Sequence, residues 1–510
     1  MTMAAGTRPG VSIPSWASLP RDLTASIVVF LVAMPLCMGI AIASGVPPER
    51  GLITGIIGGI VVGALAGSPL QVSGPAAGLA VIVYELVRDQ GLSALGPILL
   101  LAGLIQVAAG IFRLGGWFRA ISPAVVHGML AGIGVLIVVG QFHVLFDEKP
   151  LPSGLANLAA MPARLFGLSL TNLAGAELAF GIGLLTIVVM LAWERFRPQA
   201  LRLVPSALLG VLAATIVTIL SGIDVARVVV PASIAGAVVL PDAGFLARLL
   251  DPTNITIAVA IAFIASAETL LSAAAVDRMH SGVRTDYNKE LRAQGIGNLL
   301  CGAVGALPMT GVIVRSSANV QAGAVTRLSA ILHGAWILGF VALLPWLLRE
   351  IPMASLAAVL VVTGWRLVSV KHVRHLFRDY GALPAAIWAA TLVAVVTVDL
   401  LTGVLLGIGL SVLELLPNLR RLRLRIDEGQ AGAGEYRIAL EGAATFVSLP
   451  RLSDSLERVP PGAPVRLDMT RLSAADHTSA EMLREWLERR RASGTVVETL
   501  GGTGRFAAFA

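Results

Sequence analysis

The chain has 510 residues, of which 56% are hydrophobic and 14% are charged, and its mean hydropathy is +0.83. Because soluble domains carry about 25% charged residues, this composition excludes a disordered chain, a fibrous repeat and a soluble nucleic-acid-binding protein, and it indicates a polytopic membrane protein. The net charge of +7 fits this class, since basic residues of membrane proteins collect in cytoplasmic loops.

Charged residues divide the chain into parts. Residues 419–510 hold 14 of the 38 basic and 12 of the 31 acidic residues, whereas the long region before them is strongly apolar. We therefore expect a cytoplasmic N-terminal segment (1–23), a transmembrane domain (24–418), a basic linker (419–434) and a small C-terminal domain (435–510).

Apolar runs long enough to cross a bilayer, or nearly so, recur along the whole transmembrane domain. They lie at 24–44, 51–66, 94–112, 121–145, 175–193, 204–221, 255–275, 293–306, 328–347, 353–365, 382–397 and 400–417. Two shorter segments, 74–87 and 312–324, follow stretches rich in Gly, Pro and Ser. Interpreted as half-helices, they bring the total to about 14 transmembrane segments. The half-helices occupy comparable places in the two halves, 24–221 and 255–418, and seven segments per half predict an inverted repeat.

The loop charges predict the orientation of the chain in the bilayer. With the N-terminus inside, the inside loops hold 16 Lys and Arg residues and the outside loops hold 7. This bias favours a cytoplasmic N-terminus, and an even number of segments places the C-terminal domain in the cytoplasm as well. We therefore expect a multi-pass protein of the cell inner (plasma) membrane.

The starts of the two half-helices form the candidate substrate site. A helix that begins inside the membrane leaves its first N–H groups unpaired and carries a partial positive charge there, so two facing starts make an anion site. Small residues let an anion approach the backbone, and Ser73 and Thr310 can donate hydroxyl hydrogen bonds. The predicted substrate-binding residues are Ser73, Gly74, Pro75, Ala76 and Ala77 at the first start, and Thr310, Gly311, Val312, Ile313, Val314 and Arg315 at the second.

Two charged residues lie within predicted transmembrane segments. Arg315 lies just inside the second half-helix, where an intramembrane cation is a functional candidate. It either attracts the anion or pairs structurally with a carboxylate or with helix carbonyls. Glu268, in the segment 255–275, either pairs with Arg315, carries a coupling proton or helps to hold Na⁺. Ser272 lies one turn later on the same face and could add an oxygen ligand.

Other candidates rest on weaker signals. Pro35 interrupts the first span, where it either lines the substrate cavity or makes an ordinary packing kink. Gln71 and Asn319 flank the half-helices and are candidate donors behind the site. Cys37 and Cys301 have no metal-ligand spacing. We therefore expect no metal site and no cofactor, with Na⁺ or H⁺ as the candidate coupling ion.

Four segments resemble one known family of transporters. They are MPLCMGIAIASGVPP (34–48), GSPLQVSGPAAGLAVIV (67–83), ELRAQGIGNLLCGAVGALPMTG (290–311) and VRSSANVQAGAVTRLSAILHG (314–334). In this order, and over nearly the full length, the chain resembles the sulfate-permease (SulP) family, also called solute carrier family 26. The resemblance implies 14 spans in a seven-plus-seven inverted repeat, and a division into a core and a gate domain. It also implies an anion site between the third and tenth spans and elevator-like alternating access.

The resemblance also bears on single residues. Residues 73–76 match the start of the family's third span and residues 310–315 the start of the tenth, with Arg315 where animal members place a central arginine. Bicarbonate-transporting bacterial members carry Asp and Thr for sodium where this chain has Glu268 and Ser272, which argues against the same sodium coupling. Proton-coupled dicarboxylate members carry a glutamate at the cavity-lining position after the proline, where this chain has Leu36. Some similar bacterial members are fused to, or occur beside, a carbonic anhydrase, which favours bicarbonate and makes that enzyme a candidate partner.

The C-terminal domain alternates strands and helices. We predict strands at 435–440, 444–449, 464–469 and 495–500, a helix near 450–458 and a helix at 476–491. This pattern is typical of a small α/β domain, and it resembles a short form of the STAS domain that family members carry at this position. We expect the domain to mediate dimer contacts or regulation, and the protein to be a homodimer.

These observations predict a secondary active transporter of an inorganic oxyanion, bicarbonate first and sulfate second. The alternatives are a proton-coupled dicarboxylate transporter, an anion channel or voltage-responsive motor, and a membrane sensor whose tail signals. An enzyme is not expected, because the sequence contains no nucleophile–base set or cofactor motif. The expected partners are the anion, the lipid bilayer and a second copy of the chain, with no nucleic acid.

Overall fold

The computed structural model describes most of the chain. The described residues are 18–118, 122–167, 175–230, 234–239, 244–280, 282–369, 373–374, 377–378, 381–414, 424–431, 435–445, 448–460, 462–492 and 494–501. Residues 1–17 of the predicted N-terminal segment and the first part of the predicted linker, up to residue 423, lie outside them. The chain forms two compact units, here called unit 1 (Met1–Gly115 with Ala131–Val368) and unit 2 (Gly116–Leu130 with Ser369–Ala510).

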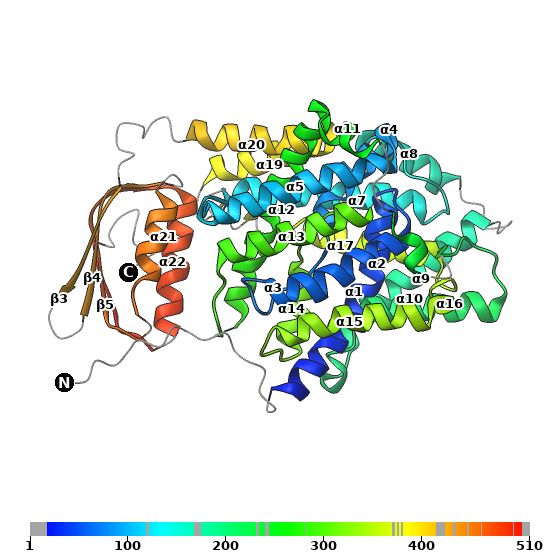
Figure 1. The fold of residues 1–510 in the computed structure, drawn as a ribbon, viewed down its shortest axis with the longest axis horizontal. Helices are drawn as coiled ribbons and strands as arrows, with labels where there is room; N and C mark the ends of the chain where they lie inside the picture. The colour runs from blue at the N-terminus through cyan, green and yellow to red at the C-terminus, as the bar shows by residue number, and fades with distance from the viewer. Residues whose placement is uncertain are drawn as a thin grey trace. The chain divides into compact units, whose positions relative to one another are not determined.

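Unit 1 is built almost entirely of helices. The longer ones are α1 (Leu19–Ala43), α5 (Leu95–Ile111), α7 (Pro123–Val144), α9 (Gly175–Phe196), α10 (Ser206–Ser221), α12 (Pro252–Met279), α13 (Tyr287–Val304), α15 (Leu328–Leu343) and α17 (Met353–Leu367). The shorter ones are α2 (Pro48–Ile57), η1 (Gly58–Val62), α3 (Gly63–Leu65), η2 (Ala77–Leu79), α4 (Ala80–Gln90), η3 (Leu92–Ala94), α6 (Gly115–Phe118), α8 (Gly154–Phe166), η4 (Gln199–Leu201), η5 (Ile234–Ala237), α11 (Phe245–Leu249), α14 (Ile313–Gln321) and α16 (Pro345–Leu348). Of these, α6 and α7 contain residues of both units. Helices α5, α12 and α13 pack against one another (Figure 1).

Many of these helices suit a bilayer by length and composition. Among the described residues, six helical stretches are long and apolar enough to cross a membrane, at 19–43, 48–65, 92–111, 123–144, 175–196 and 252–279. Five shorter apolar helices, α10, α15, α17, α19 (Ala382–Thr397) and α20 (Leu400–Glu414), add to them. The predicted membrane domain is therefore confirmed as a set of apolar helices. The first helix begins at Leu19 rather than at residue 24, because Pro20 lies in its first turn, a position that favours a helix start.

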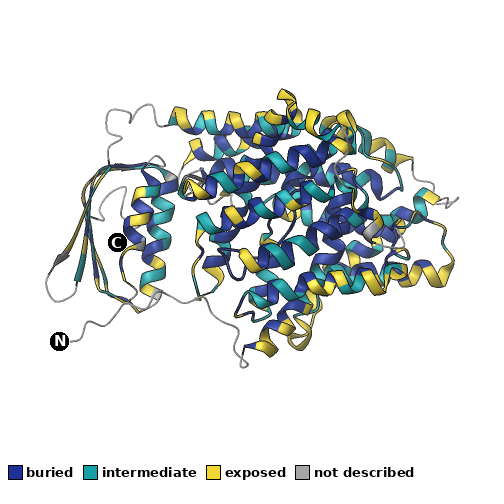
Figure 2. Cartoon of the chain, viewed as in Figure 1, coloured by how far each residue is buried: buried dark blue, intermediate teal, exposed yellow. Residues whose placement is uncertain are grey.

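The distribution of burial separates inner from outer helices of unit 1. Figure 2 shows α1 and α12 with mostly buried residues and α9 with many exposed ones. Many of the exposed residues of α9 and α10 are large and apolar, for example Leu184, Val188, Leu212 and Ile216. Exposed aliphatic faces of this extent indicate contact with lipid rather than with water.

Glycines set the contact between α5 and α13. Gly96, Gly103 and Gly110 recur every seven residues on α5, so they share one face. A Cβ atom at Gly103 would lie 2.6 Å from Leu299 N and 2.7 Å from the carbonyl oxygen of Gly295. A Cβ atom at Gly96 would lie 2.9 Å from the carbonyl oxygen of Gly302. The two backbones therefore touch directly, as small residues allow in membrane helices.

Two short strands precede the half-helices. β1 (Ser73–Pro75) and β2 (Met309–Gly311) pair antiparallel, with Ser73 opposite Gly311 and Gly74 opposite Thr310. The predicted half-helices are confirmed as short helices, but they begin later than expected, η2 and α4 at Ala77 and α14 at Ile313. Antiparallel pairing of two corresponding segments is the arrangement that an inverted repeat requires.

Unit 2 contains two further apolar helices and a sheet. α19 (Ala382–Thr397) and α20 (Leu400–Glu414) pack together. The sheet has the order β3 (Leu424–Ala431), β4 (Glu435–Ala444), β5 (Val465–Ala475) and β6 (Val497–Leu500); β3 is antiparallel to β4, and the others are parallel. α21 (Leu449–Glu457) and α22 (His477–Ala492) cover one face of it (Figure 1). Leu452, Leu456 and Leu483 from these helices form a buried core with Ile438 and Leu467 of the sheet.

Two sequence predictions for this domain are wrong. The segment predicted as a basic linker contains β3, whose alternating apolar and charged residues from Leu424 to Asp427 pair with β4. The predicted strand 444–449 is absent from the described residues: β4 runs on to Ala444, and α21 begins at Leu449. Gly442, at φ +100°, and the register shifts beside it bend β4, which explains why its sequence pattern suggested two strands.

Candidate anion-binding site

The starts of the two half-helices meet in the interior of unit 1. Besides the β1–β2 pairing, Ala76 N donates to the carbonyl oxygen of Pro308 at 3.1 Å and Val312 N donates to that of Val72 at 2.9 Å. The segments 73–77 and 310–315, separated by more than 200 residues in the sequence, are thus neighbours in the fold. Ser73, Gly74, Pro75, Ala76, Thr310, Gly311 and Arg315 are buried, whereas Ile313 and Val314 are exposed.

Polar side chains from α12, α13 and α14 hold the strand pair. Asn298 is bound to the Met309 backbone in both directions, accepting from the N–H at 2.8 Å and donating to the carbonyl at 3.2 Å. Thr269 Oγ1 accepts from Gly311 N at 3.2 Å, and Ser316 Oγ accepts from Val72 N at 2.9 Å. Because buried backbone groups must be paired, these side chains fix the backbone in place.

Arg315 is the charged group at the centre of this arrangement. Its side chain is fully buried, and none of its three guanidinium nitrogens has a hydrogen-bond partner among the described residues. It reaches from α14 to β1, where a Cβ atom at Gly74 would clash with Nη1. The Cys37 thiol and the His333 ring lie close enough to interact with it electrostatically. A buried guanidinium without an acceptor is the group expected at an anion site.

Glu268 lies on α12 beside the first half-helix. A Cβ atom at Gly78 would lie 2.7 Å from its Oε2, so the carboxylate is packed against the backbone of η2. Oε2 is buried and has no hydrogen-bond partner within the described part of the chain. No ion pair between described residues joins Glu268 to Arg315, so the fixed pair that the sequence left open is absent. Thr310, whose hydroxyl is likewise buried, lies beside this carboxylate.

The remaining predicted residues lie in a loop or in helices that contact the strand pair. Gln71 donates from Nε2 to the Thr269 carbonyl at 3.0 Å and lies against Gly311, while its Oε1 has no partner among the described residues. Pro35 and Leu36 are buried in α1, which packs against β1 and α14. Ser272 is buried in α12, which packs against β2 and α14. α1 continues through Pro35 without interruption.

A buried carboxylate that sequence reasoning missed supports the first half-helix. Glu290 Oε2 accepts from Gly67 N at 2.8 Å and from Ser68 N at 2.9 Å, in the loop before β1. Gln294 Nε2 bridges Glu290 Oε1 at 3.0 Å and Ser73 Oγ at 2.5 Å. Glu290 and Gln294 are four residues apart on α13, a spacing that places them on one helix face and was the available signal.

Comparison with known proteins identifies the family of the chain. The model of the sulfate permease family matches residues 19–391. The Bacillus subtilis protein YvdB, whose name assigns it to sulfate transport, is 33% identical over 410 residues, covering 77% of this chain and 72% of YvdB. The bicarbonate transporter BicA of Synechocystis is 24% identical over 522 residues, covering 96% of this chain and 89% of BicA.

Solved structures show the same fold. The transmembrane domain of a cyanobacterial bicarbonate transporter, BicA, matches with a TM-score of 0.66 and 25% identity, covering 76% of this chain and 98% of that domain. The structure of SLC26A9 matches with a TM-score of 0.66 over 97% of this chain and 86% of that protein, at 15% identity. The family match covers well over half of the sequence and includes both half-helices. This chain belongs to the sulfate permease family of anion transporters.

Proposed function

We propose that the chain is a secondary active carrier that moves an inorganic oxyanion across the inner membrane, with the anion bound between residues 73–77 and 310–315. The observation that supports this most strongly is the buried guanidinium of Arg315, which has no acceptor among the described residues. An ion taken out of water without a partner is destabilised by several kcal/mol. A bound anion would offset that destabilisation and accept the free N–H groups.

The proposed substrates are bicarbonate and sulfate. BicA is named for the first and YvdB for the second. Both anions spread their charge over oxygens that a guanidinium can bind through parallel hydrogen bonds. The hydroxyl of Thr310 would add a donor, since its oxygen has no other partner among the described residues.

Glu268 is the proposed coupling residue. Its buried Oε2 lies beside the first half-helix and is free of hydrogen bonds to other described residues, so a proton or a cation could neutralise it there. Ser272, one turn later, is the proposed second oxygen ligand if the cation is Na⁺. Binding of either ion at Glu268 would couple anion transport to the gradient of that ion.

The remaining proposals rest on the family resemblance. The core domain would carry the anion past the gate domain in an elevator-like movement. The protein would be a homodimer with its N-terminus and a STAS-like tail in the cytoplasm. A carbonic anhydrase would be a natural partner if bicarbonate is the substrate.

Uptake into proteoliposomes tests the proposal. Purified full-length protein would be reconstituted, and uptake of labelled bicarbonate and sulfate measured with and without Na⁺ and pH gradients. We expect saturable uptake of at least one anion and a dependence on one cation that disappears in Glu268→Gln. Absence of uptake of both anions under every gradient would contradict the carrier proposal and favour a dicarboxylate carrier or a sensor.

A further inference from the structure

A cavity lies in unit 1, and no residue of the strand pair lines it. Its volume is about 250 Å³, and it is lined by Arg50, Leu92, Ser93, Gly96, Pro97, Val239, Phe245, Arg248, Gly302 and Gly305. These residues come from the start of α2, from η3 and the start of α5, from α11, from residue 239 and from the end of α13. None of the residues that line the half-helix site is among them.

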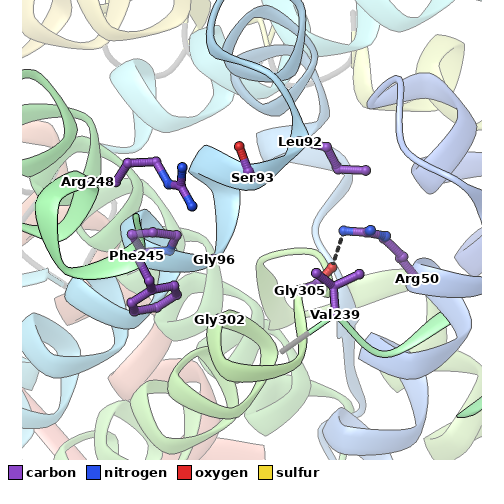
Figure 3. Close-up of a pocket in the computed structure, with 10 residues that line it drawn as sticks. Arg50, Leu92, Ser93, Gly96, Val239, Phe245, Arg248, Gly302 and Gly305 are labelled. Carbon is purple, nitrogen blue, oxygen red and sulfur yellow. Dashed lines mark hydrogen bonds between the residues drawn. The ribbon is translucent and has the colours of Figure 1, made fainter. Parts of the chain in front are cut away.

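Two guanidinium groups approach the cavity from opposite sides (Figure 3). Arg50 is only 8% exposed and donates from Nη1 to the carbonyl oxygen of Gly305 at 2.7 Å. This bond uses one of the five N–H donors of the side chain. Arg248 projects from α11, whose C-terminal end is tied to α12 by Asn254, which donates to the Arg248 carbonyl at 2.8 Å.

The lining of the cavity carries positive charge. None of the ten lining residues is acidic, while two are arginines. Glu49 acts electrostatically on Arg50 but does not line the cavity. The start of α5, a helix of 17 residues, also lines the cavity with Gly96 and adds the partial positive charge of a helix N-terminus.

The size of the cavity limits what can bind. A water molecule occupies about 30 Å³ in the liquid, so about 250 Å³ holds an oxyanion with part of its hydration shell. Drug-sized organic ligands occupy pockets of about 300–1,000 Å³, which makes the cavity small for a larger molecule. A phospholipid headgroup phosphate has the same chemistry, and the apolar lining of Leu92, Val239 and Phe245 would suit the start of its chains.

We propose that this cavity binds an oxyanion between Arg50 and Arg248, at a second site distinct from the half-helix site. The loop charges predict that this end of unit 1 faces outward. An anion held there would raise the local concentration of substrate next to the carrier. The functional consequence rests on the proposed transport activity, whereas binding itself does not.

The test uses full-length protein in a non-ionic detergent, with the half-helix site disabled by Arg315→Gln. Thermal unfolding would be followed against rising sulfate, with chloride at equal ionic strength as reference, since sulfate also stabilises proteins non-specifically. We expect a saturable rise in Tm with sulfate. Adding Arg248→Gln should abolish it or shift it to about tenfold higher sulfate, whereas Arg248→Lys, which keeps the cation, should retain most of it.

A matched control distinguishes the effect of losing this site from the effect of losing any one positive charge. Arg349 also donates to a backbone carbonyl, that of Val230 at 2.9 Å, but does not line the cavity. Arg349→Gln in the Arg315→Gln background should leave the sulfate response unchanged. Size-exclusion chromatography of each variant checks that it is folded.

A lipid arm distinguishes the two sources of the oxyanion. Mass spectrometry would measure the phospholipid that stays bound to each purified variant. Retention that depends on Arg248 would identify a headgroup phosphate, whereas a sulfate response without such retention would identify a free anion. If neither depends on Arg248, the proposal is overturned. Failure of the transport proposal would appear separately, as absence of uptake by the unmodified protein.

Discussion

At the scale of single residues, Arg315 is the group whose structure demands an explanation. Its guanidinium is buried beside Gly74, Cys37 and His333 and lacks an acceptor among the described residues. In a soluble protein such a cation would be paired or absent, because desolvation of an unpaired charge is severely unfavourable. Gly74 leaves the space that the guanidinium fills, so the two residues act as one structural feature.

Gly74→Ala is predicted to damage anion transport without unfolding the protein. The added methyl group would clash with Arg315 Nη1 and push the guanidinium away from the strand pair. We expect the KM for the anion to rise about tenfold or more, the magnitude of one lost charged hydrogen bond. Gly181→Ala is the control, because a Cβ atom there meets nothing within 4 Å. Equal KM values in the two variants would contradict this role of Gly74.

Glu290→Ala is predicted to disorganise the first half-helix. The substitution removes the acceptor of Gly67 N and Ser68 N and the partner of Gln294, leaving buried donors unpaired. Each such donor destabilises the fold by about 1–3 kcal/mol. We expect a lower Tm and slower transport, with partial recovery in Glu290→Gln, which keeps one carbonyl acceptor. A Tm equal to that of the unmodified protein would show that the carboxylate does not hold this loop.

The sequence predicted part of the site and missed another part, for a physical reason. Small residues after a Gly- and Pro-rich stretch indicate a close backbone approach locally, so segments 73–77 and 310–315 could be found. Glu290, Gln294 and Asn298 support the site through hydrogen bonds to residues more than 190 positions away in the sequence, in addition to bonds within their own part of the chain. Such distant partners cannot be identified from sequence spacing. The question of an Arg315–Glu268 pair likewise needed three-dimensional distances.

At the scale of elements, the α5–α13 contact depends on the absence of side chains. Gly103→Ala would place a Cβ atom 2.6 Å from Leu299 N, which is backbone and cannot rotate away. We expect the helices to separate, with a loss of about 1–3 kcal/mol of stability and a lower Tm in detergent. Gly339→Ala on α15 is the control, since nothing lies within 4 Å of its Cβ position. If both variants have the same Tm as the unmodified protein, the contact between α5 and α13 is not tight.

The sequence pattern predicts the long helices of the fold but not its shortest strands or β3. Long apolar helices such as α1 and α12 were predicted to within a few residues, because hydropathy alone defines them. The strands β1 and β2, of three residues each, are too short to show any period. The strand β3 was taken for a linker because the basic run Arg420, Arg421, Arg423 and Arg425 dominates the segment, although Leu424 and Ile426 pack against the core of the tail.

At the scale of the whole molecule, the loops of unit 1 sort into two groups. Loops predicted to be inside contact one another through Asp22 with Thr326, Gly67 with Glu290, Gly115 with Asn288 and Arg327 with Ala64. Loops predicted to be outside contact one another through Arg50 with Gly305 and Val239 with Val304. Each of these contacts joins loops predicted to lie on the same side, which agrees with the sidedness predicted from charge. The strand pair β1–β2 instead joins segments predicted to come from opposite sides, with Ser73 opposite Gly311.

The C-terminal domain is predicted to be dispensable for the transport step itself. All the residues proposed to bind or couple the anion lie in unit 1, and the family match ends at residue 391. A variant lacking residues 424–510 should therefore retain part of its uptake in proteoliposomes. Complete loss of uptake in a truncated protein that is still folded would contradict this prediction and indicate that the tail takes part in the movement.

The most direct test of the central claim is the uptake of labelled bicarbonate and sulfate by Arg315→Gln in proteoliposomes. Gln has a similar length but carries no charge, and Arg349→Gln serves as the matched control. The account predicts saturable uptake by the unmodified protein and by Arg349→Gln, and a fall of about a hundredfold in kcat/KM for Arg315→Gln, the size expected for a buried charged contact. Uptake by Arg315→Gln at the unmodified rate and KM would contradict an anion site built on this residue.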